Sequence, residues 1–364
     1  MAWRTARCGV AAVLLAPTTF GSPGTVSGRG ETGTLYSPAA TCSRKVPAPS
    51  DRWRQVSILR GYQGLDASFW SPCDGVVVGA AATLNPGADV AVALVTHDGG
   101  RSFARAALPL RGAPSTLDSV RVVDARHIWA GGYARGHGVM LFSSDSGRYW
   151  STQRLPAGTG PVGSIDFVDD RLGWTLGGRE PLETTDAGKT WAKRSAGGMV
   201  PSQLAFADRD HGWIVGSDER GLVALSTVDG GRHWSSWRVF GGRAATWALD
   251  FVDSQSGWLA GAATPGKFER ALLATTSNGG HVWHRLAVRA AEVVLGLRFI
   301  SPRLGWIAVQ GPRGGEIRAT RDGGRSWATV TASISVGAGP ITVWGGRVLW
   351  MVGPRGLYSA AVPP

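Results

Sequence analysis

Acidic residues recur at regular intervals along the chain, and paired carboxylates are the groups that glycoside hydrolysis requires. The regular positions are Asp98, Asp145, Asp186, Asp229, Asn278 and Asp322, at steps of 41 to 49 residues. Each lies in a polar, glycine-containing octapeptide that ends in an aromatic residue, as in TTDAGKTW and TRDGGRSW. In such a turn the aspartate accepts backbone N–H groups of the turn itself, and the glycines supply positive φ. The pattern therefore predicts structural turns and no catalytic role for these residues.

A glycosidase is nevertheless the enzymatic alternative, and it needs two facing carboxylates or a tyrosine nucleophile with an acidic partner. Glu219 with Glu269 is a weak candidate pair, and Tyr133 and Tyr358 are the tyrosines nearest to the expected binding face. The sequence has no HExxH, CxxC or GxSxG motif, and its seven histidines are scattered. GTGPVG, residues 158–163, precedes a strand-like run, where a dinucleotide fingerprint requires a helix. We therefore expect no catalytic residue, no metal and no cofactor.

Basic residues recur in a second set of loops, between the aspartate turns. They are Arg135, Arg179, Arg220, Lys267, Arg270, Arg313 and Arg355, with Arg111, Arg243 and Arg289 in the loops between successive repeats. A ring of arginines on one face could bind carboxylates, phosphates or an acidic protein loop. The alternative is a set of ordinary solvated loops, because Glu180, Asp218, Glu219 and Glu269 lie in the same loops. The sequence leaves both interpretations open.

The elements that position these residues follow from a second repeated pattern. A run of alternating β-forming residues is followed by a turn and a tryptophan, as in SIDFVDDRLGW ending at Trp174. Seven copies, at Val76, Trp129, Trp174, Trp213, Trp258, Trp306 and Trp350, recur about every 46 residues. Within residues 163–195 the pattern predicts strands over GSIDFVD, WTLGG, PLETT and TWAKRS. Four strands in each of seven repeats predict an all-β fold, a seven-bladed β-propeller.

The aspartate turns then join the third strand of a blade to the fourth. Their closing tryptophans, Trp150, Trp191, Trp234, Trp283 and Trp327, are expected to open the fourth strand and to pack between neighbouring sheets. Only GLYSA and a short tail follow the seventh copy, so the last blade lacks a fourth strand. Residues 51–59, DRWRQVSIL, resemble RSWATVTAS after the sixth turn. We therefore expect the N-terminal strand to complete the last blade.

The octapeptides match the S/T-x-D-x-G-x-x-W pattern of BNR or Asp-box repeats, which recur in sialidase-like propellers. Together with the strand–turn–GW unit, residues 51–360 resemble the photosystem II assembly-factor-like family of seven-bladed propellers. The resemblance implies a non-catalytic scaffold that holds a membrane-protein intermediate through a basic surface. A carbohydrate-active or glycan-binding propeller and a cell-envelope sensor subunit are the alternatives. The absence of an FRIP-like sequence, and seven rather than six repeats, depart from the sialidase pattern.

The first fifty residues differ from the rest. Arg4 and Arg7 precede the apolar run CGVAAVLLA, which predicts an export signal over residues 1–21, followed by a Gly/Ser/Pro-rich linker over residues 22–50 and the propeller over residues 51–364. Export predicts an extracellular or envelope-side protein, with either a Cys42–Cys73 disulfide or two free thiols.

The net charge of +12 favours an anionic partner. An acidic protein or membrane-protein segment is expected, a glycan is the alternative, and the protein is expected to be a monomer. Nucleic acid is not expected, because acidic residues interleave with the basic ones and no basic run occurs.

Overall fold

The computed structural model describes residues 53–57, 59, 61–81, 89–110, 114–264, 270–289, 292–312, 314–334, 341–353 and 356–362. The chain divides into two units, residues 1–38 and residues 39–364, and every described residue belongs to the second. The predicted export signal and linker therefore lie outside the described residues. The described residues form strands and turns and contain no helix long and apolar enough to cross a membrane.

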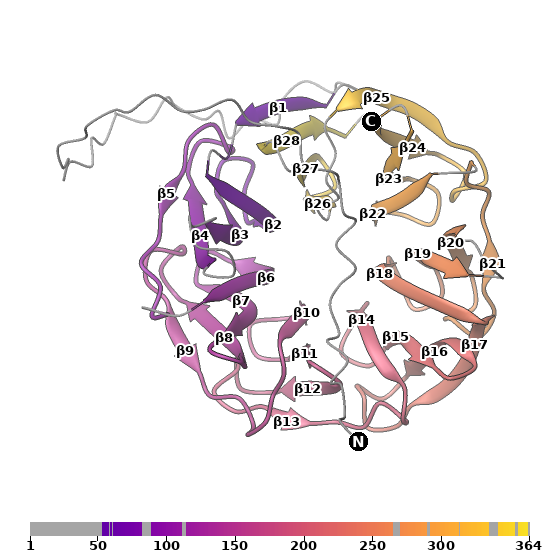
Figure 1. The fold of residues 1–364 in the computed structure, drawn as a ribbon, viewed down its shortest axis with the longest axis horizontal. Coiled ribbons are helices and arrows are strands. Elements are labelled where there is room, and N and C mark those ends of the chain that lie inside the picture. The colour runs from indigo at the N-terminus through magenta and orange to yellow at the C-terminus, as the bar shows by residue number, and fades with distance from the viewer. Residues whose placement is uncertain are drawn as a thin grey trace, which may run out of the picture. The chain divides into compact units, whose positions relative to one another are not determined.

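The second unit is a ring of seven four-stranded antiparallel sheets (Figure 1), which confirms the predicted seven-bladed β-propeller. In each sheet the strands run from the innermost, a, to the outermost, d. Blades 1 to 3 are β2 (Tyr62–Phe69), β3 (Gly75–Ala81), β4 (Val90–Thr96), β5 (Ala104–Arg105); β6 (Ser115–Asp124), β7 (His127–Ala134), β8 (His137–Ser143), β9 (Ser151–Gln153); and β10 (Val162–Phe167), β11 (Gly173–Gly177), β12 (Glu180–Thr184), β13 (Ala192–Lys193).

The remaining blades follow the same order. Blades 4 to 7 are β14 (Val200–Phe206), β15 (Gly212–Asp218), β16 (Gly221–Thr227), β17 (Ser235–Gly241); β18 (Arg243–Phe251), β19 (Gly257–Thr264), β20 (Arg270–Thr276), β21 (His284–Arg285); β22 (Val293–Phe299), β23 (Gly305–Gly311), β24 (Gly314–Thr320), β25 (Ala328–Ile334); and β26 (Ile341–Trp344), β27 (Val348–Gly353), β28 (Gly356–Ala361), β1 (Arg54–Ser57). The four strands predicted within residues 163–195 correspond to β10–β13.

Blade 7 closes the ring with strands from both ends of the propeller sequence. β1 pairs antiparallel with β28, and Arg54 lies opposite Ser359 in the register. Figure 1 shows β1 along the outer edge of this blade. Trp53, just before β1, is buried in a cluster with Trp306 and Met351. The prediction that the N-terminal strand completes the last blade is confirmed.

Aromatic stacking joins neighbouring blades. The strand-b tryptophan of one blade lies flat against the last phenylalanine of strand a in the next blade, with ring centroids 3.5–4.0 Å apart. The pairs are Trp129–Phe167, Trp174–Phe206, Trp213–Phe251, Trp258–Phe299 and Trp350–Phe69. The glycine of the GW motif makes this possible, because a Cβ at Gly257 would overlap the Phe251 ring.

Each aspartate turn is held by its own side chains. In blade 3, Asp186 accepts hydrogen bonds from the Thr184 hydroxyl (2.9 Å), the Thr190 N–H (2.9 Å) and the Thr190 hydroxyl (2.6 Å). The Thr184 hydroxyl also accepts the N–H of Gly188 at 2.8 Å. Ala187 N–H then donates to the carbonyl of Arg171, which anchors this turn to the a–b turn of the same blade.

The indole N–H groups bind polar partners both within a blade and across the seam between blades. Several of the bonds that cross between blades come from strand-b tryptophans, as Trp213 donates to the Gly279 carbonyl (2.8 Å) and Trp258 donates to the Gly323 carbonyl (3.0 Å). Among the tryptophans of the aspartate turns, Trp283 donates to Gly280 in its own turn, and its ring meets Phe251 edge-on. Trp191, in contrast, donates to Gln153 of β9 in the preceding blade at 3.4 Å, so an aspartate-turn tryptophan also reaches across a seam.

Candidate functional site

The turns lie on two opposite faces of the ring, since successive strands of a blade run antiparallel. We call the face with the a–b and c–d turns the box face, because it holds the aspartate turns. The opposite face, with the b–c turns and the connections from d to the next a, is the loop face. The predicted basic ring belongs to the loop face.

The structure describes some of the arginines predicted for that ring, and others lie outside the described residues. Arg135, Arg179 and Arg220 are exposed in b–c turns, and Arg135 has a positive φ of 53° in a two-residue turn with Gly136. Arg243 is also exposed, but it is the first residue of β18 rather than part of a loop, because β17 and β18 extend to leave only one residue between them. Lys267, Arg313 and Arg355 lie outside the described residues, as does the Arg270 side chain at the start of β20.

A groove of about 800 Å³ lies on the loop face at the seam of blades 4 and 5. Its lining includes Val200, Ser217, Asp218, Glu219, Arg220, Arg238 and Arg243. Arg238 donates to both oxygens of Asp218 at 2.7 Å, and this pairing holds the pKa of the Asp218 carboxyl well below its usual range. Within the described residues, Arg220 and Arg243 make no ion pair. Two guanidinium groups in this groove therefore remain available to an anionic ligand.

Two of the four acidic residues predicted to neutralise the ring are engaged by outer strands, whereas Glu219 lines the groove, is exposed and makes no ion pair among the described residues. Glu180 pairs with Lys193 of β13 at 2.7 Å, and Asp218 pairs with Arg238 of β17. Glu269 lies outside the described residues. The loop arginines at 179 and 220 thus keep their charge uncompensated in the part of the chain that the structure describes.

Sequence reasoning missed a buried ion cluster on the loop side of blade 6. Arg318 of β24 donates to Glu292 through both terminal nitrogens, at 2.8 and 2.6 Å, and through Nε to Glu316 at 2.9 Å. The Arg318 and Glu292 side chains are less than a tenth exposed. Hydrogen bonds from Arg318 lower the pKa of both glutamates. The spacing of two between Glu316 and Arg318 was a signal, since it places both on one face of a strand.

Burial raises the pKa of three carboxyls, Asp66, Asp118 and Asp250, and two of them, Asp66 and Asp250, serve the seams between blades. Burial raises the pKa of Asp66 to about 7 and raises that of Asp250. Asp66 accepts the N–H of Val120 in the next blade at 2.8 Å, and Asp250 accepts the N–H of Phe299 at 2.7 Å. A glycosidase needs a protonated carboxyl that faces its substrate. Asp66 and Asp250 instead bind the neighbouring backbone.

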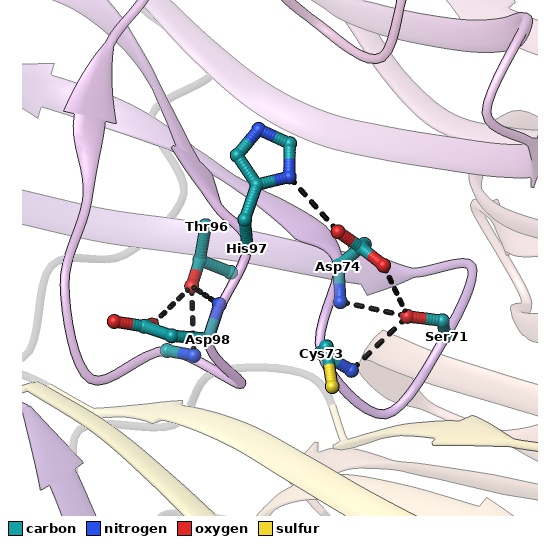
Figure 2. A network of polar contacts seen from close by, with 7 residues as sticks. Ser71, Cys73, Asp74, Thr96, His97 and Asp98 are labelled. Carbon is teal, nitrogen blue, oxygen red and sulfur yellow. Dashed lines mark hydrogen bonds and ion pairs between the residues drawn. The ribbon is translucent and has the colours of Figure 1, made fainter. Parts of the chain in front are cut away.

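Blade 1 carries a polar network beside its aspartate turn (Figure 2). Asp74 contacts Nδ1 of His97 at 2.9 Å and accepts the Ser71 hydroxyl at 2.6 Å. Cys73 in the same turn is disulfide-bonded, and its predicted partner, Cys42, lies outside the described residues. Among the described residues, no cluster of three or more His, Cys, Asp or Glu side chains could hold a metal ion.

The sequence matches, over residues 197–291, the family described as photosynthesis system II assembly factor YCF48. A photosystem II assembly lipoprotein, Ycf48 of Synechococcus sp. (strain CC9902), is 31% identical over 144 residues. That match spans 39% of this chain and 39% of the relative.

Solved structures share the fold. YCF48 bound to a D1 peptide has a TM-score of 0.67 at 19% identity, covering 90% of this chain and all of that one. YCF48 from Cyanidioschyzon merolae has a TM-score of 0.63 at 19% identity, covering 86% of this chain and 99% of that one. A GH74 xyloglucanase from Xanthomonas campestris has a TM-score of 0.59 at 15% identity, covering 85% of this chain and 53% of that one. The chain thus shares the β-propeller fold of these structures, and residues 197–291 are similar to the photosystem II assembly factor YCF48 family.

Proposed function

We propose that this protein is a non-catalytic scaffold that binds an acidic segment of a protein partner at the loop face. The observation that carries the proposal is the groove of about 800 Å³ in which Arg220 and Arg243 have no ion-pair partner among the described residues. Arginine binds carboxylates through two parallel hydrogen bonds, and such pairs are stronger in a partly enclosed site. Arg179, exposed on the neighbouring blade 3, extends the basic surface.

The similarity to assembly factors supports a protein as the partner. One of those similar propellers has been solved with a D1 peptide bound. The curated relative is a lipoprotein, and an exported location is proposed for this chain by analogy. The partner of this chain is proposed to be a segment of a membrane protein, held during assembly.

Carbohydrate hydrolysis is the second candidate, because GH74 enzymes share the fold. It has weaker support. Asp218, in the groove, is fully engaged by Arg238, and the pKa of Asp218 lies low, so this carboxyl does not supply a general acid.

The experiment compares capture of envelope proteins by the wild type and by a variant with Arg179→Glu, Arg220→Glu and Arg243→Glu. A captured protein is then purified, and its affinity for both proteins is measured. Charge reversal should weaken binding at least tenfold, since each lost charge-assisted pair is worth about 1.5–3 kcal/mol. The control carries Arg105→Glu and Arg154→Glu on the outer strands, which are exposed and away from the groove. Equal affinity of both variants would reject the loop face, and turnover of xyloglucan or a sialoside would reject a purely binding role.

A further inference from the structure

The box face carries a second basic groove, at the seam of blades 5 and 6. Its volume is about 690 Å³, and Arg303, Arg321 and Arg325 line it together with His284 and the hydroxyl residues Thr275 and Ser277. All three arginines are exposed. None of them forms an ion pair within the described part of the chain. Three guanidinium groups therefore line one groove in which Asp322 is the one acidic lining residue.

The lack of acidic partners has local causes. The a–b turn of blade 6 has Ser301 where the turns of blades 2 to 5 place Asp124, Asp169, Asp208 and Asp253. The aspartate turn of blade 5 has Asn278 in the acidic position. Asp322 is present, but its carboxylate already accepts two hydrogen bonds from Ser326, one from the hydroxyl at 2.6 Å and one from the N–H at 2.9 Å. The Ser326 hydroxyl bond lowers the pKa of Asp322 to about 2, so the carboxylate stays within its own turn.

The equivalent box-face groove, at the seam of blades 3 and 4, differs in the number of acidic residues that line it. It holds arginines at related positions, Arg171, Arg209 and Arg232, but its lining also includes Glu183, Asp210 and Asp229. Arg209 pairs with Asp169 of the neighbouring turn. Three acidic lining residues thus balance three arginines in this groove, whereas Asp322 alone faces three arginines at the seam of blades 5 and 6.

An apolar pocket of about 310 Å³ adjoins the basic groove on the other side of the blade 6 turn. Trp53, Leu304, Trp306, Val330 and Leu349 line it, and Arg321 lines both the pocket and the groove. Trp306 is only 3% exposed. Among the described residues, its indole N–H has no hydrogen-bond partner. An accessible indole N–H, on a ring that is otherwise buried, therefore borders an apolar pocket.

Three other seams indicate what this donor would bind, whereas Trp174 at the seam of blades 3 and 4 has no such bond. At the two preceding seams, Trp213 and Trp258 donate to backbone carbonyls of Gly279 and Gly323, each in the aspartate turn of the next blade. Blade 7 has no c–d turn, because its strands β28 and β1 come from opposite ends of the propeller. A ligand with a backbone carbonyl could occupy the corresponding position beside Trp306.

We propose that this part of the box face binds a second acidic peptide, one that carries an apolar side chain. Carboxylates of the peptide pair with Arg303, Arg321 and Arg325, its apolar side chain enters the pocket beside Trp53, and one of its carbonyls accepts the Trp306 N–H. A scaffold with this site could hold two acidic segments at once, one on each face.

The charge of the remaining box face argues against an anionic membrane as the occupant. In the turns of blades 1 to 4, ten aspartates outnumber seven arginines and lysines: Asp74, Asp98, Asp124, Asp145, Asp169, Asp170, Asp186, Asp208, Asp210 and Asp229 against Arg101, Arg126, Arg148, Arg171, Lys189, Arg209 and Arg232. A bilayer surface would meet this whole face and be repelled over most of it, whereas a short peptide is confined to the basic sector.

The probe is a fluorescently labelled, end-blocked peptide with one phenylalanine between two pairs of glutamates, measured by anisotropy with the full chain. The Arg303→Glu, Arg325→Glu variant should lose at least tenfold in affinity, because two charge-assisted pairs become repulsions. The matched variant, Arg171→Glu with Arg232→Glu in the groove at the seam of blades 3 and 4, should stay within about twofold of the wild type. A peptide with glycine in place of phenylalanine should bind about tenfold more weakly, through loss of apolar burial.

Three outcomes would overturn the proposal. They are equal losses in the two double variants, equal affinity for the phenylalanine and glycine peptides, and tighter binding to phosphatidylglycerol vesicles than to the peptide. The loop-face variant with Arg179→Glu, Arg220→Glu and Arg243→Glu must retain the Phe-dependent binding. This last comparison separates a failure of the box-face site from a failure of the proposed loop-face function.

Discussion

The indole ring of Trp213 in blade 4 lies flat on the phenyl ring of Phe251 in blade 5, with centroids 3.5 Å apart and an interplanar angle of 2°. The same indole donates its N–H to the carbonyl of Gly279 in the blade 5 turn. One side chain therefore couples the inner strand and the outer turn of the next blade. Both contacts cross a seam that no strand pairing bridges.

Replacing Phe251 by alanine is expected to lower the free energy of unfolding by about 3–5 kcal/mol, because it removes the stacking partner and leaves a cavity between two blades. Urea unfolding monitored by circular dichroism measures the change. The control is Val228→Ala, whose side chain is 73% exposed and should change stability by less than about 0.5 kcal/mol. A loss at Phe251 no larger than that of the control would show that stacking does not hold the seam.

Replacing Arg318 by methionine should destabilise the fold by about 3–5 kcal/mol, because Glu292 would remain buried with only the exposed Arg289, 3.9 Å away, as a counter-ion. Adding Glu292→Gln and Glu316→Gln should recover most of that loss, since no buried charge then remains. Thermal unfolding of the single and triple variants at pH 7 tests this. If the triple variant is no more stable than the single one, the cost lies in packing and the charge argument fails.

Asp66 should make the protein less stable as pH rises. Burial raises the pKa of Asp66 to about 7 in the folded protein, whereas its pKa in the unfolded chain is about 3.9. The stability that protonated Asp66 contributes is therefore fully present below about pH 3.9 and is lost as the pH rises through about 7. Asp66→Ser removes the titration and keeps an acceptor for Val120 N–H, because Ser119 and Ser164 accept the equivalent bonds in the next two blades. Between pH 4 and pH 8 the wild type should lose up to about 4 kcal/mol relative to the variant. Parallel stability curves for the two proteins would contradict this prediction.

Asparagine should replace aspartate in the turns at little cost. Asn278 already accepts its turn's two bonds through Oδ1, from the Thr276 hydroxyl (2.9 Å) and the Val282 N–H (3.0 Å). Asp186→Asn keeps the equivalent pair and should lose less than about 1 kcal/mol, whereas Asp186→Ala loses both acceptors and should cost about 1–2 kcal/mol. Chemical denaturation ranks the two variants, and equal costs would mean that the turn does not depend on this side chain.

Removal of residues 1–58 should expose the edge of β28 by deleting β1. An unpaired strand edge recruits other chains, so we expect a lower melting temperature and concentration-dependent oligomers. A chain starting at Asp51, which retains Trp53 and β1, is the control. Light scattering during size-exclusion chromatography distinguishes the two, and a monomeric truncated protein of unchanged stability would show that closure by β1 is dispensable.

The sequence by itself determined the number of blades, the four strands of each and the closure by the N-terminal strand. These are local or periodic properties, because a turn such as TTDAGKTW and a strand such as SIDF carry their own hydrogen-bond and burial patterns. It also indicated which loops carry arginines on one face.

Only the tertiary structure decided which of these charges are free. Asp218 is neutralised by Arg238, twenty residues away, and Arg318 by Glu292, twenty-six residues away. Arg303 and Arg325, in contrast, make no ion pair among the described residues. Their groove has one acidic lining residue, Asp322, because Ser301 and Asn278 stand where other turns have aspartate. Ion pairing depends on distances of a few ångströms between side chains from different strands and blades, and repeat spacing along the chain does not specify those distances.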